Sequence, residues 1–308
     1  MRSFSTTRVL LIALGVIVVA SFLPLWVTGY ILGLLTIAYY FGVFAMAWDL
    51  LFGFAGEVNF GPTFLIGTGA YAAGILDNLY QPPIWVCLVA GALAAVTGGV
   101  VLALPALRVR GPYFGLTTLV AVLILQNFIV VAAGLTGGEI GLTVPDVISV
   151  SDTTNYEIAL WFMAVSGAIL FSLSRSPVGL ILQASGQDAV QAAALGFNVT
   201  KHKLAAFIIS AFFSGLAGAL LVFYLGTASV GTLVDITVGV QIIIAAVLGG
   251  RRTILGAVLG AVFLIAMSEA LRPLGDLSNF VVFAMALIVV LLFPGGFFGL
   301  LTRTKESE

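Results

Sequence analysis

The chain is divided into about ten apolar segments, each long enough to cross a lipid bilayer as a helix. The hydrocarbon core of a bilayer is spanned by about 20 predominantly apolar residues in helical conformation. Segments close to this length follow one another at 9–27, 31–51, 62–80, 84–107, 112–134, 157–174, 204–225, 236–250, 253–271 and 278–298. The least typical are 62–80, which is rich in glycine and threonine, and 236–250, which is short. We predict an all-α, polytopic membrane protein with about ten transmembrane helices in one domain, residues 1–308.

The composition agrees with this class and argues against several others. Apolar residues make up 61% of the chain and charged residues 8%, whereas about 25% of a soluble domain is charged. A net charge of −1 argues against nucleic-acid binding, which needs a clustered basic surface. The single histidine, His202, argues against most metal sites and histidine-based catalysis, and the single cysteine, Cys87, is expected to be a buried thiol. We predict neither an enzyme nor a cofactor.

The first apolar segment raises the question of a cleaved signal peptide. It follows Arg2 and Arg8, as the core of a signal peptide follows basic residues. Its apolar stretch is too long for a typical signal core, however, and no small-residue cleavage pattern precedes Trp26. We therefore predict that this segment is a retained helix.

The basic residues predict the orientation of the helices, because lysine and arginine stay on the cytoplasmic side of a membrane. With ten crossings and a cytoplasmic N-terminus, Arg272 alone among the 12 basic residues falls outside. The others fall inside: Arg2, Arg8, Arg108, Arg110, Arg175, Lys201, Lys203, Arg251, Arg252, Arg303 and Lys305. One helix more or fewer would spoil this separation. We therefore predict that both termini face the cytoplasm.

Two connections are long enough to contain structure of their own: an outer loop, 135–156, and an inner loop, 175–203. In the inner loop, Ser185 precedes Asp188 by three residues, which is the spacing of a capping box at a helix start. An alanine-rich stretch follows, and Gly196 suits the left-handed residue just beyond a helix end. We predict a short cytoplasmic helix at 186–196.

This short helix is expected to have an apolar face made of Val190, Ala193, Ala194 and Phe197. A helix of this kind can simply lie on the membrane surface. Its face is small, nearly uncharged and poor in aromatic anchors, however, so we expect a partner to dock on it.

Several motifs resemble the branched-chain amino acid permease family, the membrane-spanning subunits of one group of ABC importers. They are Leu51-Phe-Gly-Phe-Ala-Gly-Glu-Val-Asn-Phe-Gly61, Gly67-Thr-Gly-Ala-Tyr71, Leu107-Arg-Val-Arg-Gly-Pro-Tyr113, Leu135-Thr-Gly-Gly-Glu-Ile-Gly-Leu142, the inner loop 175–207, Val247-Leu-Gly-Gly250 and Gly256-Ala-Val-Leu-Gly-Ala261. They recur in the order expected for the family over most of the chain. The blocks 107–142 and 175–207 look more like the second of the family's two paired permeases.

This resemblance implies a set of partners. They are ATP-binding cassette subunits, a homologous second permease and an extracytoplasmic solute-binding protein, with the chain in a bacterial or archaeal cytoplasmic (inner) membrane. The chain has no Gly-x-x-x-x-Gly-Lys-[Ser/Thr] motif, so ATP hydrolysis is expected in a separate subunit. The inner loop looks like the family's coupling loop, and we expect contact with the ATPase through Asp188, Gln191, Ala192, Ala193, Ala194 and Gly196.

The implied solute is a branched-chain amino acid. Urea, short amides and small aromatic acids are alternatives within the class, and simple sugars are a more distant one. The sequence departs from the family pattern at Asp49, Glu57 and Pro62, and again at Arg251 and Arg252, where a small uncharged pair is usual. These departures leave room for a change of solute.

Polar residues at membrane depth are candidates for the solute path: Asn59, Thr63, Gln126, Asn127 and Gln241. Their alternative role is hydrogen bonding between helices, which contributes about 0.6 kcal/mol on average. Asp49 and Glu57 are either functional or solvated by water near the inner boundary.

An ion-coupled secondary transporter is the main rival class, because transporters of that kind use carboxylates at mid-membrane. The helix cores nearly lack such carboxylates, which favours the ATP-driven importer over this rival and over a channel.

Overall fold

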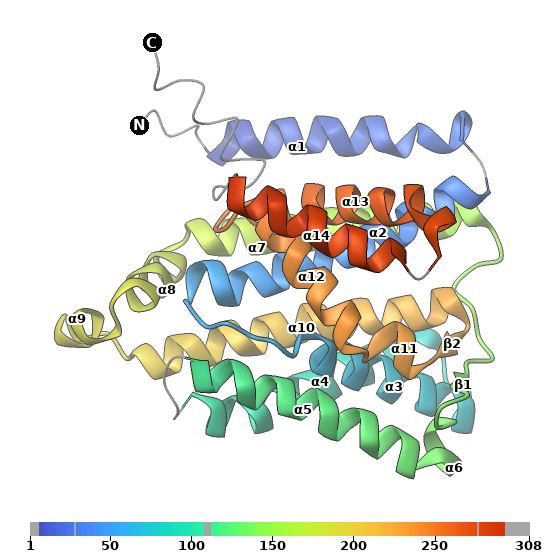
Figure 1. The fold of residues 1–308 in the computed structure, drawn as a ribbon, viewed down its shortest axis with the longest axis horizontal. Helices are drawn as coiled ribbons and strands as arrows, with labels where there is room; N and C mark the ends of the chain where they lie inside the picture. Colours follow the sequence, from blue (N-terminus) through green and yellow to red (C-terminus); the bar gives the residue numbers. More distant parts are fainter. Residues whose placement is uncertain (1–5, 28, 108–111, 276, 293–308) are drawn as a thin grey trace.

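The structure is a computed structural model that describes residues 6–27, 29–107, 112–275 and 277–292. Its long helices are α1 (Thr6–Ser21), α2 (Tyr30–Asp49), α3 (Pro62–Tyr80), α4 (Ile84–Ala106), α5 (Pro112–Val131), α7 (Asp152–Arg175), α10 (Val199–Leu225), α12 (Ile236–Gly249), α13 (Leu255–Ala270) and α14 (Leu277–Leu292). They lie roughly side by side along the longest axis of the molecule (Figure 1).

Each predicted apolar segment coincides with one of these helices, although 293–298 lies outside the described residues. By length and apolarity, six helical stretches of the described chain are able to cross a membrane: Tyr30–Phe54, Ile84–Ala106, Tyr113–Val131, Asp152–Arg175, Val199–Leu225 and Val230–Gly249. Leu11–Leu25 and Leu255–Ala270 are apolar but shorter. The all-α polytopic class is confirmed, and the number of ten crossings stays a prediction.

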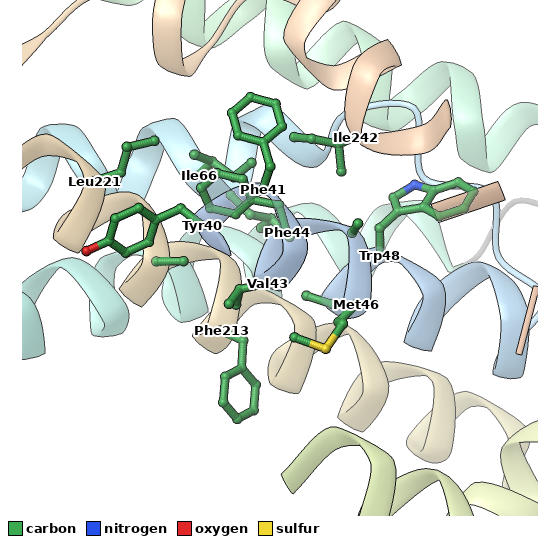
Figure 2. Packing of buried hydrophobic residues seen from close by; sticks show 14 of the residues in the cluster. Tyr40, Phe41, Val43, Phe44, Met46, Trp48, Ile66, Phe213, Leu221 and Ile242 are labelled. Carbon is green, nitrogen blue, oxygen red and sulfur yellow. The ribbon is translucent and has the colours of Figure 1, made fainter. Parts of the chain in front are cut away.

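Helix α2 is the central helix of the fold. Every residue from Ala38 to Leu51 is buried, because α7, α10, α12 and α13 pack around this helix. A helix that is hydrophobic on all sides belongs in a protein interior. Figure 2 shows its side chains among Ile66 of α3, Phe213 of α10 and Ile242 of α12.

The short elements gather at the two ends of the bundle (Figure 1). At one end, α8 (Pro177–Gln187) and α9 (Ala189–Ala194) lie near the start of α1 and the end of α14. At the other end lie α6 (Ala133–Thr136), α11 (Val230–Leu233) and the strands β1 (Leu142–Thr143) and β2 (Thr227–Ala228). The predicted inner and outer loops are therefore at opposite ends of the molecule.

The two strands form an antiparallel ribbon in which Leu142 pairs with Ala228 and Thr143 with Thr227. The C-terminal part of α3 is attached to the chain around this ribbon. The Asn78 amide donates to the Thr143 carbonyl at 2.9 Å, and the backbone N–H of Asp146 donates to the Asp77 carboxylate at 3.2 Å. The end of α3 and the two strands thus form one hydrogen-bonded unit.

Candidate functional site

Helix α9 begins with a side-chain cap. Asp188 is its N-cap, and the carboxylate accepts hydrogen bonds from the backbone N–H groups of Val190 at 2.9 Å and Gln191 at 3.0 Å. Gly196 has a φ of 89°, as predicted for the residue beyond the helix end. The predicted capping box is wrong, however, because Ser185 is a buried residue of α8 and Asp188 itself is the cap.

Helix α9 projects from the end of the bundle (Figure 1). The predicted apolar face is exposed: Ala193 and Ala194 are solvent-accessible, and Val190 is 73% exposed. Gln191 is also exposed. Ala192 alone of the predicted coupling residues is buried, at 2% exposure, so it packs against the rest of the chain rather than facing outward.

Helix α8 lies against the linker that joins α2 to α3. The linker follows the π-helical turn Leu50–Phe54 and runs without helix to Gly61. A methyl group at Gly186 would lie 2.6 Å from the Phe54 carbonyl oxygen and 2.9 Å from the Gly56 nitrogen. Both distances are too short for any real contact, so only glycine fits here. Backbone therefore packs directly on backbone between α8 and the linker.

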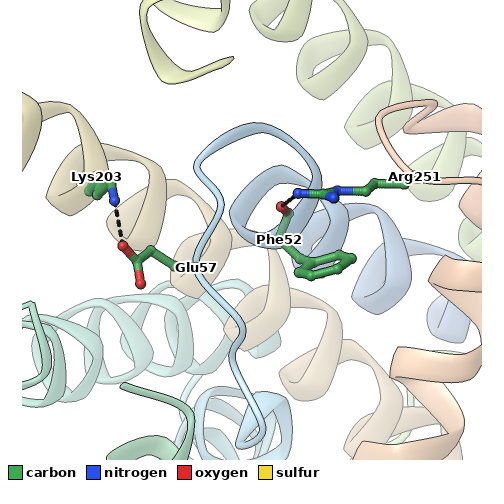
Figure 3. A network of polar contacts seen from close by, with 4 residues as sticks. All are labelled: Phe52, Glu57, Lys203 and Arg251. Carbon is green, nitrogen blue, oxygen red and sulfur yellow. Dashed lines mark hydrogen bonds and ion pairs between the residues drawn. The ribbon is translucent and has the colours of Figure 1, made fainter. Parts of the chain in front are cut away.

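An ion pair attaches the same linker to α10. The Lys203 ammonium is 2.5 Å from the Glu57 carboxylate, and the two side chains are 14% and 16% exposed (Figure 3). Lys203 lies in the first turns of α10 and is the last residue of the predicted inner loop, 175–203. Glu57 is thus a paired carboxylate, held at the point where the linker passes α8 and α10.

Asp49 closes the end of α2 against the turn between α12 and α13. Its carboxylate is 1% exposed and accepts the backbone N–H groups of Arg252 and Ile254, each at 3.0 Å. These two residues have positive φ angles of 65° and 46°. Of the two alternatives kept open for Asp49, solvation by water is wrong, because the turn covers the carboxylate and backbone N–H groups satisfy it.

The same turn also contacts the π-helical segment Leu50–Phe54 through its two arginines. The Nε of Arg252 donates to the Gly53 carbonyl at 2.7 Å. The guanidinium of Arg251 lies 4.5 Å from the centre of the Phe52 ring (Figure 3). The two arginines thus contact the backbone and one ring of the same short helical segment, and they join it to the α12–α13 turn.

The linker then continues into the helix layer. The indole N–H of Trp48 donates to the Asn59 carbonyl at 2.7 Å, and the backbone N–H of Phe60 donates to the Thr118 hydroxyl at 3.0 Å. Thr118 is six residues after the start of α5, or about 9 Å along that helix. Non-helical backbone at membrane depth is tolerated where protein buries it or where it lines a path.

Asn59 and Thr63 meet where the linker becomes α3. Both are 1% exposed, and the Asn59 side-chain oxygen accepts the backbone N–H of Gly61 at 2.8 Å. Among the described residues, the Thr63 hydroxyl oxygen has no hydrogen-bond partner. Gly239 of α12 faces it, since a methyl group there would lie 3.6 Å from this oxygen. The start of α3 therefore presents an unsatisfied hydroxyl to α12.

The remaining candidates are placed differently. The amide of Gln126 donates to the Val234 carbonyl at 3.2 Å and so bridges α5 to the chain just after α11. Gln241 is half-buried on α12. Asn127 is exposed on α5, and its amide donates to the Leu123 carbonyl of its own helix at 2.8 Å. The structure thus brings Asn59 and Thr63 together, and it leaves Asn127 exposed on the surface of the bundle.

A cavity of about 420 Å³ runs between α4 and α5. It is lined by Leu102, Tyr113, Leu116, Thr117, Val120, Ala121 and Ile124. These side chains are mostly apolar, and none of the predicted path residues is among them. The predicted solute-path residues therefore do not line this cavity.

Comparison with known proteins assigns the family. Residues 30–292 match the model of the family described as the branched-chain amino acid transport system permease component. The chain belongs to this family. It is 25% identical to the high-affinity branched-chain amino acid transport system permease protein LivM of Salmonella typhimurium, over 95% of this chain and 75% of that one.

Two further relatives of the permease match about half of it. The LivH permease protein of the same kind of system in Escherichia coli K12 is 29% identical over 47% of this chain and 48% of its own. The ribose import permease protein RbsC of Haemophilus influenzae is 28% identical over 43% of each chain. The resemblance inferred from the motifs is therefore confirmed.

In this permease, the positions that depart from the expected family pattern have partners in the fold. Asp49 binds the turn that contains Arg252, and Glu57 pairs with Lys203. Pro62 is the first residue of α3, a position that suits proline because its missing N–H has no partner there in any case. Sequence reasoning missed the roles of Lys203, which pairs with Glu57, and of Gly186, which packs on the linker. The only local signal for Gly186 was a glycine inside an otherwise helix-favouring stretch.

Proposed function

We propose that this chain is the membrane-spanning permease subunit of an ATP-driven ABC importer and that it translocates branched-chain amino acids. The observation that carries the proposal is the family match over residues 30–292, together with the similarity to LivM over 95% of the chain. The exposed helix α9 supports it, because a permease of this class needs a docking surface for an ATPase.

The ATPase would act on the permease through α9. Its exposed apolar face is the docking surface, and Asp188 and Gly196 define where the helix begins and ends. A displacement of α9 passes to α8 and then to the linker, since Gly186 touches the linker backbone directly. The Glu57–Lys203 ion pair holds the linker to α10. Movement of this end therefore reaches Asn59 and Thr63.

The proposed topology has ten crossings in the cytoplasmic (inner) membrane. Both termini and the α8–α9 end face the cytoplasm, and the β1–β2 end faces outward, as the distribution of basic residues predicts. In this orientation the ATPase subunits bind at the α8–α9 end. A solute-binding protein delivers the amino acid at the β1–β2 end.

The solute path is proposed to run along α3, α5 and α12, with a second permease completing it. The similarity to LivH, itself a permease protein, supports a homologous partner. Asn127 supports placing the second permease or the path against α5, because an exposed amide is unfavourable against lipid but can form hydrogen bonds in an interface or a path. Asn59, Thr63, Gln126 and Gln241 supply neutral hydrogen-bonding groups for a zwitterion.

Uptake measurements with the whole importer test this proposal. Proteoliposomes would receive ATP inside or an ion gradient alone, and labelled leucine, ribose, urea, benzoate and a dicarboxylate would be compared. ATP-dependent leucine uptake is the expected result. Uptake driven by an ion gradient without ATP would identify a secondary transporter, and uptake of another solute in place of leucine would overturn the choice of substrate.

A further inference from the structure

A second cavity, of about 440 Å³, lies at the α8–α9 end of the bundle. It is lined by Phe54, Ser174, Arg175, Leu180, Gln183 and Arg252. These residues come from the π-helical segment, the last turn of α7, helix α8 and the turn between α12 and α13. The cavity is therefore a gap between these elements at the end of the bundle that the proposed topology places at the cytoplasmic side, and two of its six lining residues are arginines.

Both arginines make contacts that leave part of the guanidinium available. The Nε of Arg252 donates to the Gly53 carbonyl, and among the described residues its terminal amino groups have no acceptor. Arg175 is exposed, and its guanidinium carbon lies 5.3 Å from the centre of the Phe171 ring, a contact that uses no N–H group. Two guanidiniums lining one cavity suit the oxygens of a phosphate, which arginine binds through paired hydrogen bonds.

The nearby carboxylates do not neutralise this cavity. Among the described residues of this end, Asp49 accepts backbone N–H groups, Glu57 is paired with Lys203, and Asp188 caps α9. No ion pair is formed by either lining arginine among the described residues, so their positive charge suits an anion.

An exposed stripe on α7 leads away from the cavity along the bundle. Trp161, Ala168 and Arg175 are seven residues apart, so they lie on one side of the helix, and Val165 is beside them. All four are exposed. The stripe from Trp161 to Arg175 is about 21 Å long, which exceeds the roughly 15 Å depth of one hydrocarbon leaflet. An acyl chain therefore fits along it with its headgroup at the cavity.

We propose that this cavity binds the phosphate headgroup of an anionic phospholipid whose acyl chain lies on the exposed face of α7. The site joins four elements, including the α8 helix and the turn that Asp49 holds. Basic pockets between transmembrane helices bind the headgroups of anionic lipids by the same chemistry. The bound lipid would connect α7, α8 and the α12–α13 turn across the gap between them.

The test uses the complete importer in nanodiscs of equal parts phosphatidylcholine and phosphatidylglycerol, with bound lipid counted by native mass spectrometry. The wild type is expected to retain phosphatidylglycerol. Arg175→Gln and Arg252→Gln should each weaken this retention about fivefold, because one basic group near a membrane surface contributes about that factor. Lys201→Gln is the matched control, since Lys201 is an exposed cation near the same end but outside the cavity.

Two further arms make the assignment falsifiable. Arg252→Lys keeps the charge if Arg252→Gln fails to fold, and it should retain the lipid. Inorganic phosphate, compared with chloride at equal ionic strength, should leave the lipid bound; displacement would assign the cavity to free phosphate and overturn the proposal. Equal loss in Lys201→Gln would overturn it as well.

Discussion

Gly186→Ala gives the most direct test of the contact between α8 and the linker. The added methyl group would lie 2.6 Å from the Phe54 carbonyl oxygen and 2.9 Å from the Ala55 carbonyl carbon. Both neighbours are backbone atoms, so no side-chain rotation relieves the overlap. Only separation of α8 from the linker does, and overpacking of this kind costs about 1–3 kcal/mol. Alanine has no φ penalty here, because Gly186 is helical.

The assay measures ATP hydrolysed per leucine taken up, in proteoliposomes that contain the whole importer. Gly186→Ala should raise this ratio, because α8 no longer passes its displacement to the linker, and it should also lower the temperature at which the permease loses its native elution profile. Gly15→Ala is the control, since Gly15 is a helical glycine of α1 with no atom within 4 Å of the added methyl group. If the two variants behave alike, α8 does not transmit force through this contact.

Three other predictions follow from the same geometry. Glu57→Lys places two cations at the linker and should reduce uptake strongly, and the exchanged pair with Lys203→Glu should restore most of it; a double variant no better than Glu57→Lys would refute the ion pair. Ala193→Trp should weaken ATPase co-purification at least tenfold, because a bulky ring on the exposed face of α9 prevents close docking, and unchanged co-purification would remove α9 from the interface. In a cysteine-free background, Ser151→Cys should react with an impermeant thiol reagent in intact cells, whereas Val190→Cys should react only after the membrane is opened; the reverse pattern would invert the topology.

Sequence reasoning predicted the helices well because a membrane-spanning length of apolar residues is a local property. Gly196 likewise marked the end of α9, since capping groups act within a few residues. The boundary between α8 and α9 was predicted wrongly. Ser185 has a cap residue's chemistry, but it is buried inside α8, which continues to Gln187.

The contacts that define the candidate site could not be predicted because they join distant parts of the chain. The Glu57–Lys203 pair spans 146 residues, and the bond from Arg252 to Asp49 spans 203. No periodicity in one helix specifies such a pairing. Asn127 illustrates the same limit: α5 has apolar residues on all sides and no polar face, so the sequence does not show which side is exposed.

The ribbon of β1 and β2 has a mechanical consequence for α3. Its hydrogen bonds to Asn78 and the neighbouring bond to Asp77 make the C-terminal end of α3 a fixed pivot. The opposite end is attached to the linker, whose backbone α8 contacts at Gly186. With 19 residues, α3 is a lever about 28 Å long. Tilting it by about 10° about the ribbon moves Thr63 by about 5 Å, a displacement comparable to the size of an amino-acid side chain, while the outer end stays in place.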